Sequence, residues 1–331
     1  MSYTSGGLIQ ATDYNGFVST TSDANLNDIL GTGATDKGYG QTPVGTVSAA
    51  GSVTATQWAA LVNQLILVGN HQGTAITSRS APVTGGTINT LDDVGTNLTT
   101  LNTQRGSAAG SGTEIVAFSG TSSQTAAVGS GTAAWTITYT HTITFADAAS
   151  ARYFWNAGGI VKWQSSKTST GEDADEEWND LATTLAGAIS ITGGTATSTI
   201  NSVSYTGTTK TGGTGTPATL ASTTGWYDLT TSDAVIYKQF ADTAPYTAQY
   251  IQISAKTAGS GTQLVLTTVW NDPGGSAVGS SDNITGGTAT STPFSSFGTG
   301  PASIVTVIPP STTYLSNSWG TPTVAAAIAV T

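Results

Sequence analysis

The sequence predicts a mainly β protein with an N-terminal helical region and an antiparallel β-sandwich body. Apolar residues recur at helical spacing in the first hundred or so residues, whereas alternating patterns separated by Gly, Thr, Asp and Pro turns fill the chain from Thr113 onward. A Gly/Ser-rich segment lies between the two. We therefore expect a helical attachment or oligomerisation region at 1–107, a linker at 108–112 and a β-body at 113–331, built as one sandwich or as two β-units.

Short helical turns are expected before residue 31, followed by an amphipathic helix of about four turns. This helix begins after Thr54 or Thr56 as its N-cap and stops before Gly73. Its apolar face comprises Trp58, Leu61, Leu65 and Val68.

A second helical pattern places apolar residues three, four and three positions apart, as in an a/d seam. Its members are Leu91, Val94, Leu98 and Leu101. Two heptads are too short for an independent coiled coil, so two interpretations are open: packing on the preceding helix in an αα-hairpin, or a seam between copies of the chain. Gly95 lowers helix stability in either case.

The run WTITYTHTITF, from Trp135 to Phe145, alternates large residues with threonines. Side chains of a strand point to opposite faces with period 2, so one face is large and apolar and the other consists of threonine. That threonine face comprises Thr136, Thr138, Thr140, Thr142 and Thr144. Because it carries no charge to deter pairing, we expect it to pack on a neighbouring sheet or subunit, with a solvated face as the alternative.

Further strands are expected along the rest of the β-body. Their sequences are TEIVAF, GIVKW, STINSVSYT, DAVIYKQF, YTAQYIQISAKT, TQLVLTTVW, ASIVTVI and PTVAAAIAV. One helix, EDADEEWNDLATTLAGAI, interrupts them. The nonapeptide ITGGTATST occurs at 191–199 and again at 284–292, but its flanks differ, so we interpret it as two loops of similar composition.

The composition excludes several partners. Only 8% of the residues are charged and the formal net charge is -10, which disfavours a nucleic-acid backbone as partner. The chain has no cysteine, and no segment resembles a signal peptide or a membrane span. No membrane insertion is expected, and exposure outside a cell would follow release in an assembled particle.

Groups for catalysis are scarce, so we expect no enzymatic activity and no cofactor. The sequence contains two histidines, His71 and His141. We expect His71 at a helix C-terminus, where the helix dipole stabilises its positive charge, and His141 in a core or an interface. Acidic residues between Glu172 and Asp180 suggest either a calcium site or carboxylates that complement a helix N-terminus. A carboxylate pair for glycan cleavage has no distinctive signature. The aromatic residues that offer either sugar stacking or core packing are Trp226, Tyr227, Trp270 and Trp319.

Several stretches together resemble a family of virion structural proteins of tailed phages, particularly cyanophages. In order, they are GLIQATDYNGFV, GTGATDKGYGQT, VTATQWAALVNQL with its trailing HQG, ITFADAASARYFWNAGGIV and TTYLSNSWG. The resemblance implies a non-enzymatic, oligomeric component of the tail, neck or fibres, and it transfers no catalytic residues. The acidic helix and the insert GTTKTGGTGTPAT have no place in that pattern.

Three function classes follow. The first is a structural virion component that docks on the particle through its N-terminal region. We expect it to form a homo-oligomer, with a trimer favoured, and to contact other virion proteins. The second is a receptor-binding module for host surface glycan, with a capsid decoration protein as a further alternative. The third is a glycan-cleaving spike, which would require depolymerase activity. In each case we expect the protein in the virion, assembled in the host cytoplasm.

Overall fold

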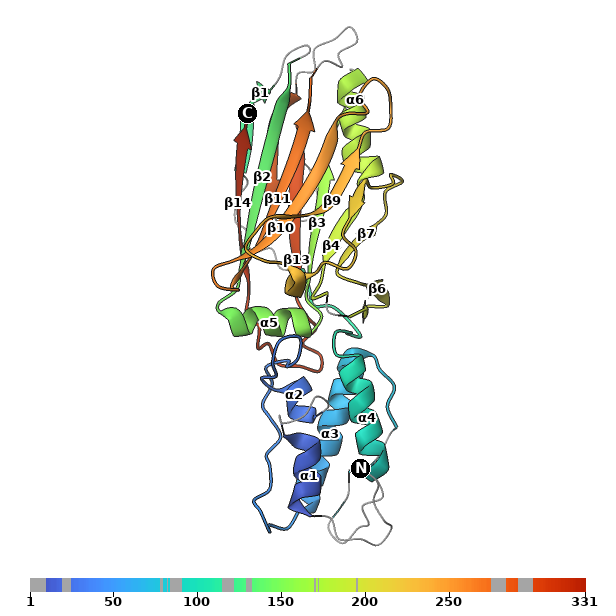
Figure 1. Ribbon diagram of the computed structural model, residues 1–331, viewed down its shortest axis with the longest axis vertical. Helices are drawn as coiled ribbons and strands as arrows, with labels where there is room; N and C mark the ends of the chain where they lie inside the picture. Colours follow the sequence, from blue (N-terminus) through green and yellow to red (C-terminus); the bar gives the residue numbers. More distant parts are fainter. Residues whose placement is uncertain are drawn as a thin grey trace.

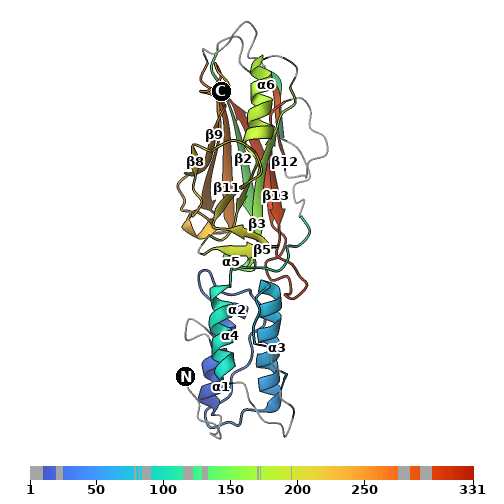
Figure 2. The same ribbon diagram turned by 90° about the vertical axis from the view of Figure 1, so that its right-hand side faces the viewer.

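The computed structural model describes residues 10–19, 25–77, 80–81, 83, 91–114, 122–128, 133–169, 171, 173–194, 196–274, 284–290 and 300–331. The chain is mostly β, with antiparallel sheets and a few helices. Figures 1 and 2 show an elongated molecule in which the first helices lie at one end and two large sheets fill the other.

Among the described residues, the helical end contains the helices α1 (Ala11–Val18), α2 (Leu26–Leu30), α3 (Ala55–Gln72) and α4 (Leu91–Thr103). The predicted boundaries of α3 are confirmed. The side chain of Thr54 accepts a hydrogen bond from the Gln57 amide, and Gly73 ends the helix in the left-handed conformation at φ 64°.

Helix α4 packs on α3, but the two helices do not form an αα-hairpin. Their C-terminal ends lie together, where the side-chain amide of Gln72 donates to the Leu101 carbonyl at 3.0 Å. The chain after α3 runs back beside α4, and Asn97 exchanges two hydrogen bonds with the backbone of Thr77. The helices are therefore parallel, and Figure 2 shows them side by side.

Most strands among the remaining described residues belong to two six-stranded sheets. The first has the order β1 (Ser122–Val128), β12 (Ile284–Thr290), β13 (Ala302–Ile308), β3 (Ile160–Ser166), β4 (Ala188–Ile191) and β7 (Thr208–Thr211). The second has the order β14 (Thr323–Val330), β2 (Trp135–Thr144), β11 (Gln263–Asp272), β10 (Tyr250–Ala258), β9 (Ala234–Phe240) and β8 (Thr219–Leu220). All pairs are antiparallel except β12 with β13.

The core lies between these sheets. Large side chains of β2 enter it, and the exposed fractions of Ile137 and Tyr139 are both 0%. The Tyr139 hydroxyl donates to the Pro301 carbonyl at 3.0 Å, and the rings of Trp163 on β3 and Tyr237 on β9 lie 6.3 Å apart. Both contacts join one sheet to the other.

Three smaller elements are α5 (Ala148–Asn156), the short hairpin β5 (Ser198–Ile200) with β6 (Val203–Tyr205), and η2 (Trp226–Asp228). The predicted acidic helix forms as α6 (Asp173–Asn179) and continues as a π-helical turn, Asp180–Leu185. The predicted strand TEIVAF lies largely outside the described residues.

The nonapeptide prediction was half wrong. Its first copy runs from the end of β4 through a loop into β5, whereas its second copy supplies strand β12. The difference comes from pairing, because β12 has β1 and β13 as neighbours on its two sides. The predicted single strand at 198–206 is also a hairpin, since Asn201 and Ser202 adopt positive φ and turn the chain.

Candidate functional site

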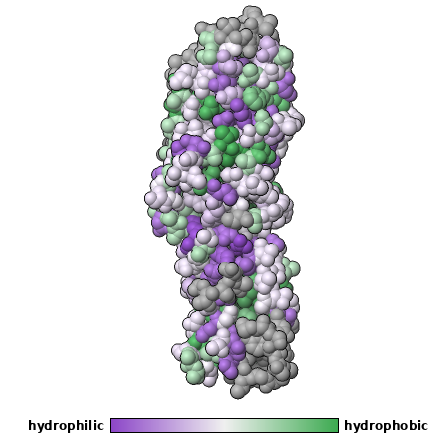
Figure 3. Space-filling view, in the orientation of Figure 1, coloured by the Kyte–Doolittle hydropathy of each residue, from purple (hydrophilic) through white to green (hydrophobic). Residues whose placement is uncertain are grey.

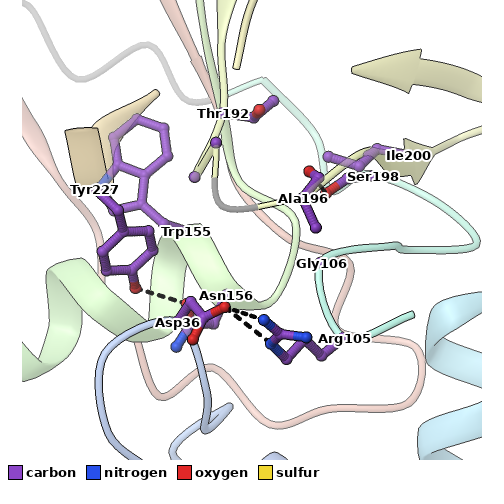
Figure 4. A pocket seen from close by; sticks show the side chains of 12 residues that line it. Asp36, Arg105, Gly106, Trp155, Asn156, Thr192, Ala196, Ser198, Ile200 and Tyr227 are labelled. Carbon is purple, nitrogen blue, oxygen red and sulfur yellow. Dashed lines mark hydrogen bonds and ion pairs between the residues drawn. The ribbon is translucent and has the colours of Figure 1, made fainter. Parts of the chain in front are cut away.

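The junction between the helical end and the sheets is built from buried polar side chains. Asn156, the last residue of α5, is 3% exposed. Its side-chain amide donates to the carbonyls of Lys37 at 2.8 Å and Gly38 at 3.1 Å. Its carbonyl oxygen accepts from the Tyr227 hydroxyl at 2.6 Å, as Figure 4 shows. One side chain thus ties a loop of the helical end to the β-region.

An ion pair completes this junction from the helical side. The guanidinium of Arg105, just beyond α4, donates to the Asp36 carboxylate through Nε at 2.9 Å and also through Nη2. It also donates to the Asn102 carbonyl at 2.8 Å. The Arg105 carbonyl accepts from the Tyr39 hydroxyl at 2.8 Å. The pair therefore holds the loop around Asp36 against the end of α4.

The cavity at this junction has a volume of only about 10 Å³. Asp36, Arg105, Asn156 and Tyr227 are among its lining residues (Figure 4). Such a volume holds about one water molecule. The junction is thus a filled joint between two parts of the molecule rather than a pocket for a small ligand.

Two further segments reach this joint. The expected linker residues 108–112 are hydrogen-bonded to their surroundings: the Ala108 amide donates to the Thr199 carbonyl at 2.8 Å, and the Gly112 amide to the Pro309 carbonyl at 2.7 Å. Gln41 exchanges bonds of 2.9 and 2.8 Å with the backbone of Ser316. The segment that the sequence indicates as a linker is thus fastened on both sides.

Removing the Arg105 charge should destabilise the joint. In Arg105→Met, the Asp36 carboxylate, 13% exposed, loses the guanidinium that neutralises it, and we expect the free energy of unfolding to fall by about 2 kcal/mol. The control is Lys162→Met, which breaks the more exposed pair with Glu114 and should cost at most about 0.5 kcal/mol. Denaturant titration of both variants measures the difference, and equal losses would contradict the role of the Arg105 pair.

His71 is held neutral at the same joint, contrary to the expected charge at the helix C-terminus. It is 1% exposed, and burial lowers its pKa to about 4. Its Nε2 lies 3.1 Å from the Ala157 carbonyl, which requires a proton on that nitrogen. His71 therefore acts as a neutral donor between α3 and the end of α5.

This burial predicts a pH dependence of stability. The folded pKa of His71, about 4, lies below the unfolded value of about 6.5, so the unfolded chain binds the extra proton between these values. The contribution is complete above pH 6.5 and is lost as the pH falls toward 4. Between pH 7 and pH 5 the native chain should lose about 2 kcal/mol more stability than His71→Gln. Urea titrations at these two pH values test this, and identical losses would refute it.

The predicted apolar seam lies inside the chain. Val94, Leu98 and Leu101 are at most 2% exposed and belong to the same core as residues of α3. The side chain of Leu91 lies outside those described. As placed, these three residues stabilise the helical end itself.

The threonines of β2 face away from the core and are partly exposed. Thr140 lies between Thr267 of β11 and Ala327 of β14, so the face continues across neighbouring strands. It is one broad sheet surface of small side chains. Its packing on another subunit stays a prediction.

Carboxylates gather at a second location. Glu177, Asp180 and Asp242 bring oxygens within 4.8 Å of one another, beside an open cleft of about 470 Å³. Burial raises the pKa of Glu177, which also accepts a hydrogen bond from the Asp242 amide at 3.2 Å. Asp242 lies outside the acidic segment of the sequence, so only the fold brings this residue to the cluster.

The three tryptophans proposed as candidates for sugar stacking are inside the protein. Trp270 and Trp319 are at most 1% exposed, and Trp226 is 7% exposed and stacks on Trp155 at 5.4 Å. Tyr227 is half-buried at the joint. His141 is fully buried on β2. The core interpretation of the tryptophans agrees with these positions.

Comparison with known proteins leaves the geometry as the basis for function. The sequence matches no known protein-family model, and neither curated proteins nor solved structures give a significant match. Within the described part of the chain, none of the helices has both the length and the apolar character needed to cross a membrane.

Proposed function

We propose that this chain is a non-enzymatic structural component of a tailed-phage virion, associated with the tail, neck or fibres. In this proposal the helices of residues 1–107 dock on the particle and the two sheets act as a β-sandwich body that contacts other subunits. The observation that carries it is the joint itself: Asn156 and the Arg105–Asp36 pair fix a helical end to a β-end in an elongated molecule.

A joint filled with hydrogen-bonded polar side chains favours a rigid component, in which the two ends keep one relative arrangement, over a component that opens at this point. Buried hydrogen bonds to several carbonyls specify one relative arrangement of the two ends. A connecting component needs such an arrangement because a partner bound at one end must find the other end at a fixed place. The sequence resemblance to phage structural proteins points to the same role.

The test is localisation on particles. Antibodies raised against the full-length chain are expected to label one fixed position on virions of the phage that encodes it, by immunogold electron microscopy. Pre-incubation of the antibodies with purified chain should abolish the label. Particles that are complete by microscopy yet carry neither label nor the chain by mass spectrometry would refute the proposal.

A further inference from the structure

The outer face of the second sheet is almost free of charge. From the strand registers, its central rows run from Ala325, Ala327 and Ala329 of β14, across the β2 threonines, to Val265, Thr267 and Val269 of β11 and on to Gln252, Ser254 and Lys256 of β10. Among the described outward-facing residues of the five strands from β14 to β9, only Lys238 and Lys256 are charged. Figure 3 shows apolar side chains gathered over the middle of this surface.

This composition favours a second copy of the same chain as the occupant. The chain carries a net charge of -10, so two copies repel each other wherever carboxylates meet. The strand residues of this face carry no carboxylate, and the carboxylate at its edge, Asp233 just before β9, is paired with Lys256 at 2.9 Å, so little of that repulsion acts here. Val235 of β9 is 40% exposed on this face, and a partner sheet would bury it.

The area is close to that of a stable interface. Five strands about 4.8 Å apart and about eight residues long, as β14 is, cover roughly 650 Å². A standard interface buries about 800 Å² on each partner, and the accessible surface of such a face exceeds its projected area because side chains stand above it.

The two sides of the face differ in height. The β14 side carries alanines, whereas on the β9 side Lys238 lies over the rings of Tyr250 and Phe240, with Nζ 3.6 and 4.7 Å from the ring centres. One side is therefore low and the other is a ridge. A two-fold axis parallel to the strands places the ridge of each copy over the alanines of the other.

We propose that two copies of this chain pack face to face through strands β14, β2, β11, β10 and β9, about a two-fold axis along β11. Ala327 of one copy then faces Val235 of the other, because both lie in the row of Thr267. Thr267 meets its own counterpart near the axis. This inference rests on the proposed structural role and identifies the surface through which two copies of the chain contact each other.

Light scattering of the full-length chain tests the stoichiometry. We expect a particle of twice the 33.2 kDa chain mass that dissociates on dilution. Thr267→Arg places two guanidinium groups opposite each other and should weaken the dimer at least about 100-fold. The matched control is Thr199→Arg, an exposed threonine on β5, which should leave the mass unchanged. A monomer or a trimer of the unmodified chain overturns the proposal.

Cross-linking tests the orientation of the two copies. Because the sequence contains no cysteine, only the introduced cysteines react with the cross-linker. In a mixture of Ala327→Cys and Val235→Cys chains, a short bis-maleimide should join unlike chains. Either variant alone should give little product, because identical positions lie on opposite sides of the axis. Equal yields in all three samples would overturn the two-fold arrangement.

The failure of this inference can be told apart from failure of the proposed function. Light scattering and cross-linking use only the purified chain, whereas immunogold labelling uses the virion. A monomeric chain that labels virions refutes the dimer and keeps the structural role. A dimeric chain that is absent from virions supports the dimer and refutes the structural role.

Discussion

Asn156→Ala should lower the free energy of unfolding by about 3 kcal/mol. The change removes one buried side chain and leaves the Tyr227 hydroxyl and the carbonyls of Lys37 and Gly38 without their partner. Each unpaired buried group costs about 1–3 kcal/mol, and the alanine reaches none of them. Denaturant titration followed by circular dichroism measures the loss.

Tyr227→Phe is the matched control for this prediction. It removes only the hydroxyl at 2.6 Å and leaves the amide of Asn156 bonded to the loop of the helical end. We expect a loss of about 1 kcal/mol. If both variants lose the same amount, the bonds from Asn156 to the loop contribute nothing to stability and the joint is not the fixed element described above.

Trp178→Ala should have a still larger effect, about 4 kcal/mol. Trp178 of α6 is 1% exposed and lies between Trp135 at 5.0 Å and Trp270 at 5.4 Å. Removing the indole leaves a cavity among rings of β2 and β11 that backbone movement cannot fill. The midpoint and slope of guanidinium unfolding test this.

The control on the same helix is Glu176→Ala. Glu176 is exposed, and its substitution should change stability by no more than about 0.5 kcal/mol. If Trp178→Ala unfolded no more easily than Glu176→Ala, then α6 would not be anchored in the core between the sheets.

The sequence predicts the helices and strands whose formation is determined by residues close together in the chain. Helix α3 follows from the Thr54 cap and Gly73, and β2 from strict alternation. Helix α5 was not predicted, although the sequence carries a signal for it. Asp147 is its N-cap and accepts a hydrogen bond from the Ser150 amide at 2.7 Å. A search for aspartate followed by small residues would have found it.

The joint could not be predicted in the same way. Asn156 reaches Lys37 across 119 positions, and Gln41 reaches Ser316 across 275. No periodicity or cap links such residues, since only the packing of helices against sheets brings them together. The parallel setting of α3 and α4 has the same origin: apolar spacing defines which face of a helix is buried but not its direction.

The contact between Gln41 and Ser316 also has a consequence for the order in which the chain matures. At a synthesis rate of about 5–20 residues per second, the ribosome completes Ser316 roughly 14–55 s after Gln41. The helices of the N-terminal region can form early, yet the loop beside them waits for the last strands. A nascent chain therefore cannot complete the contacts between the Gln41 loop and the C-terminal segment until translation is nearly finished.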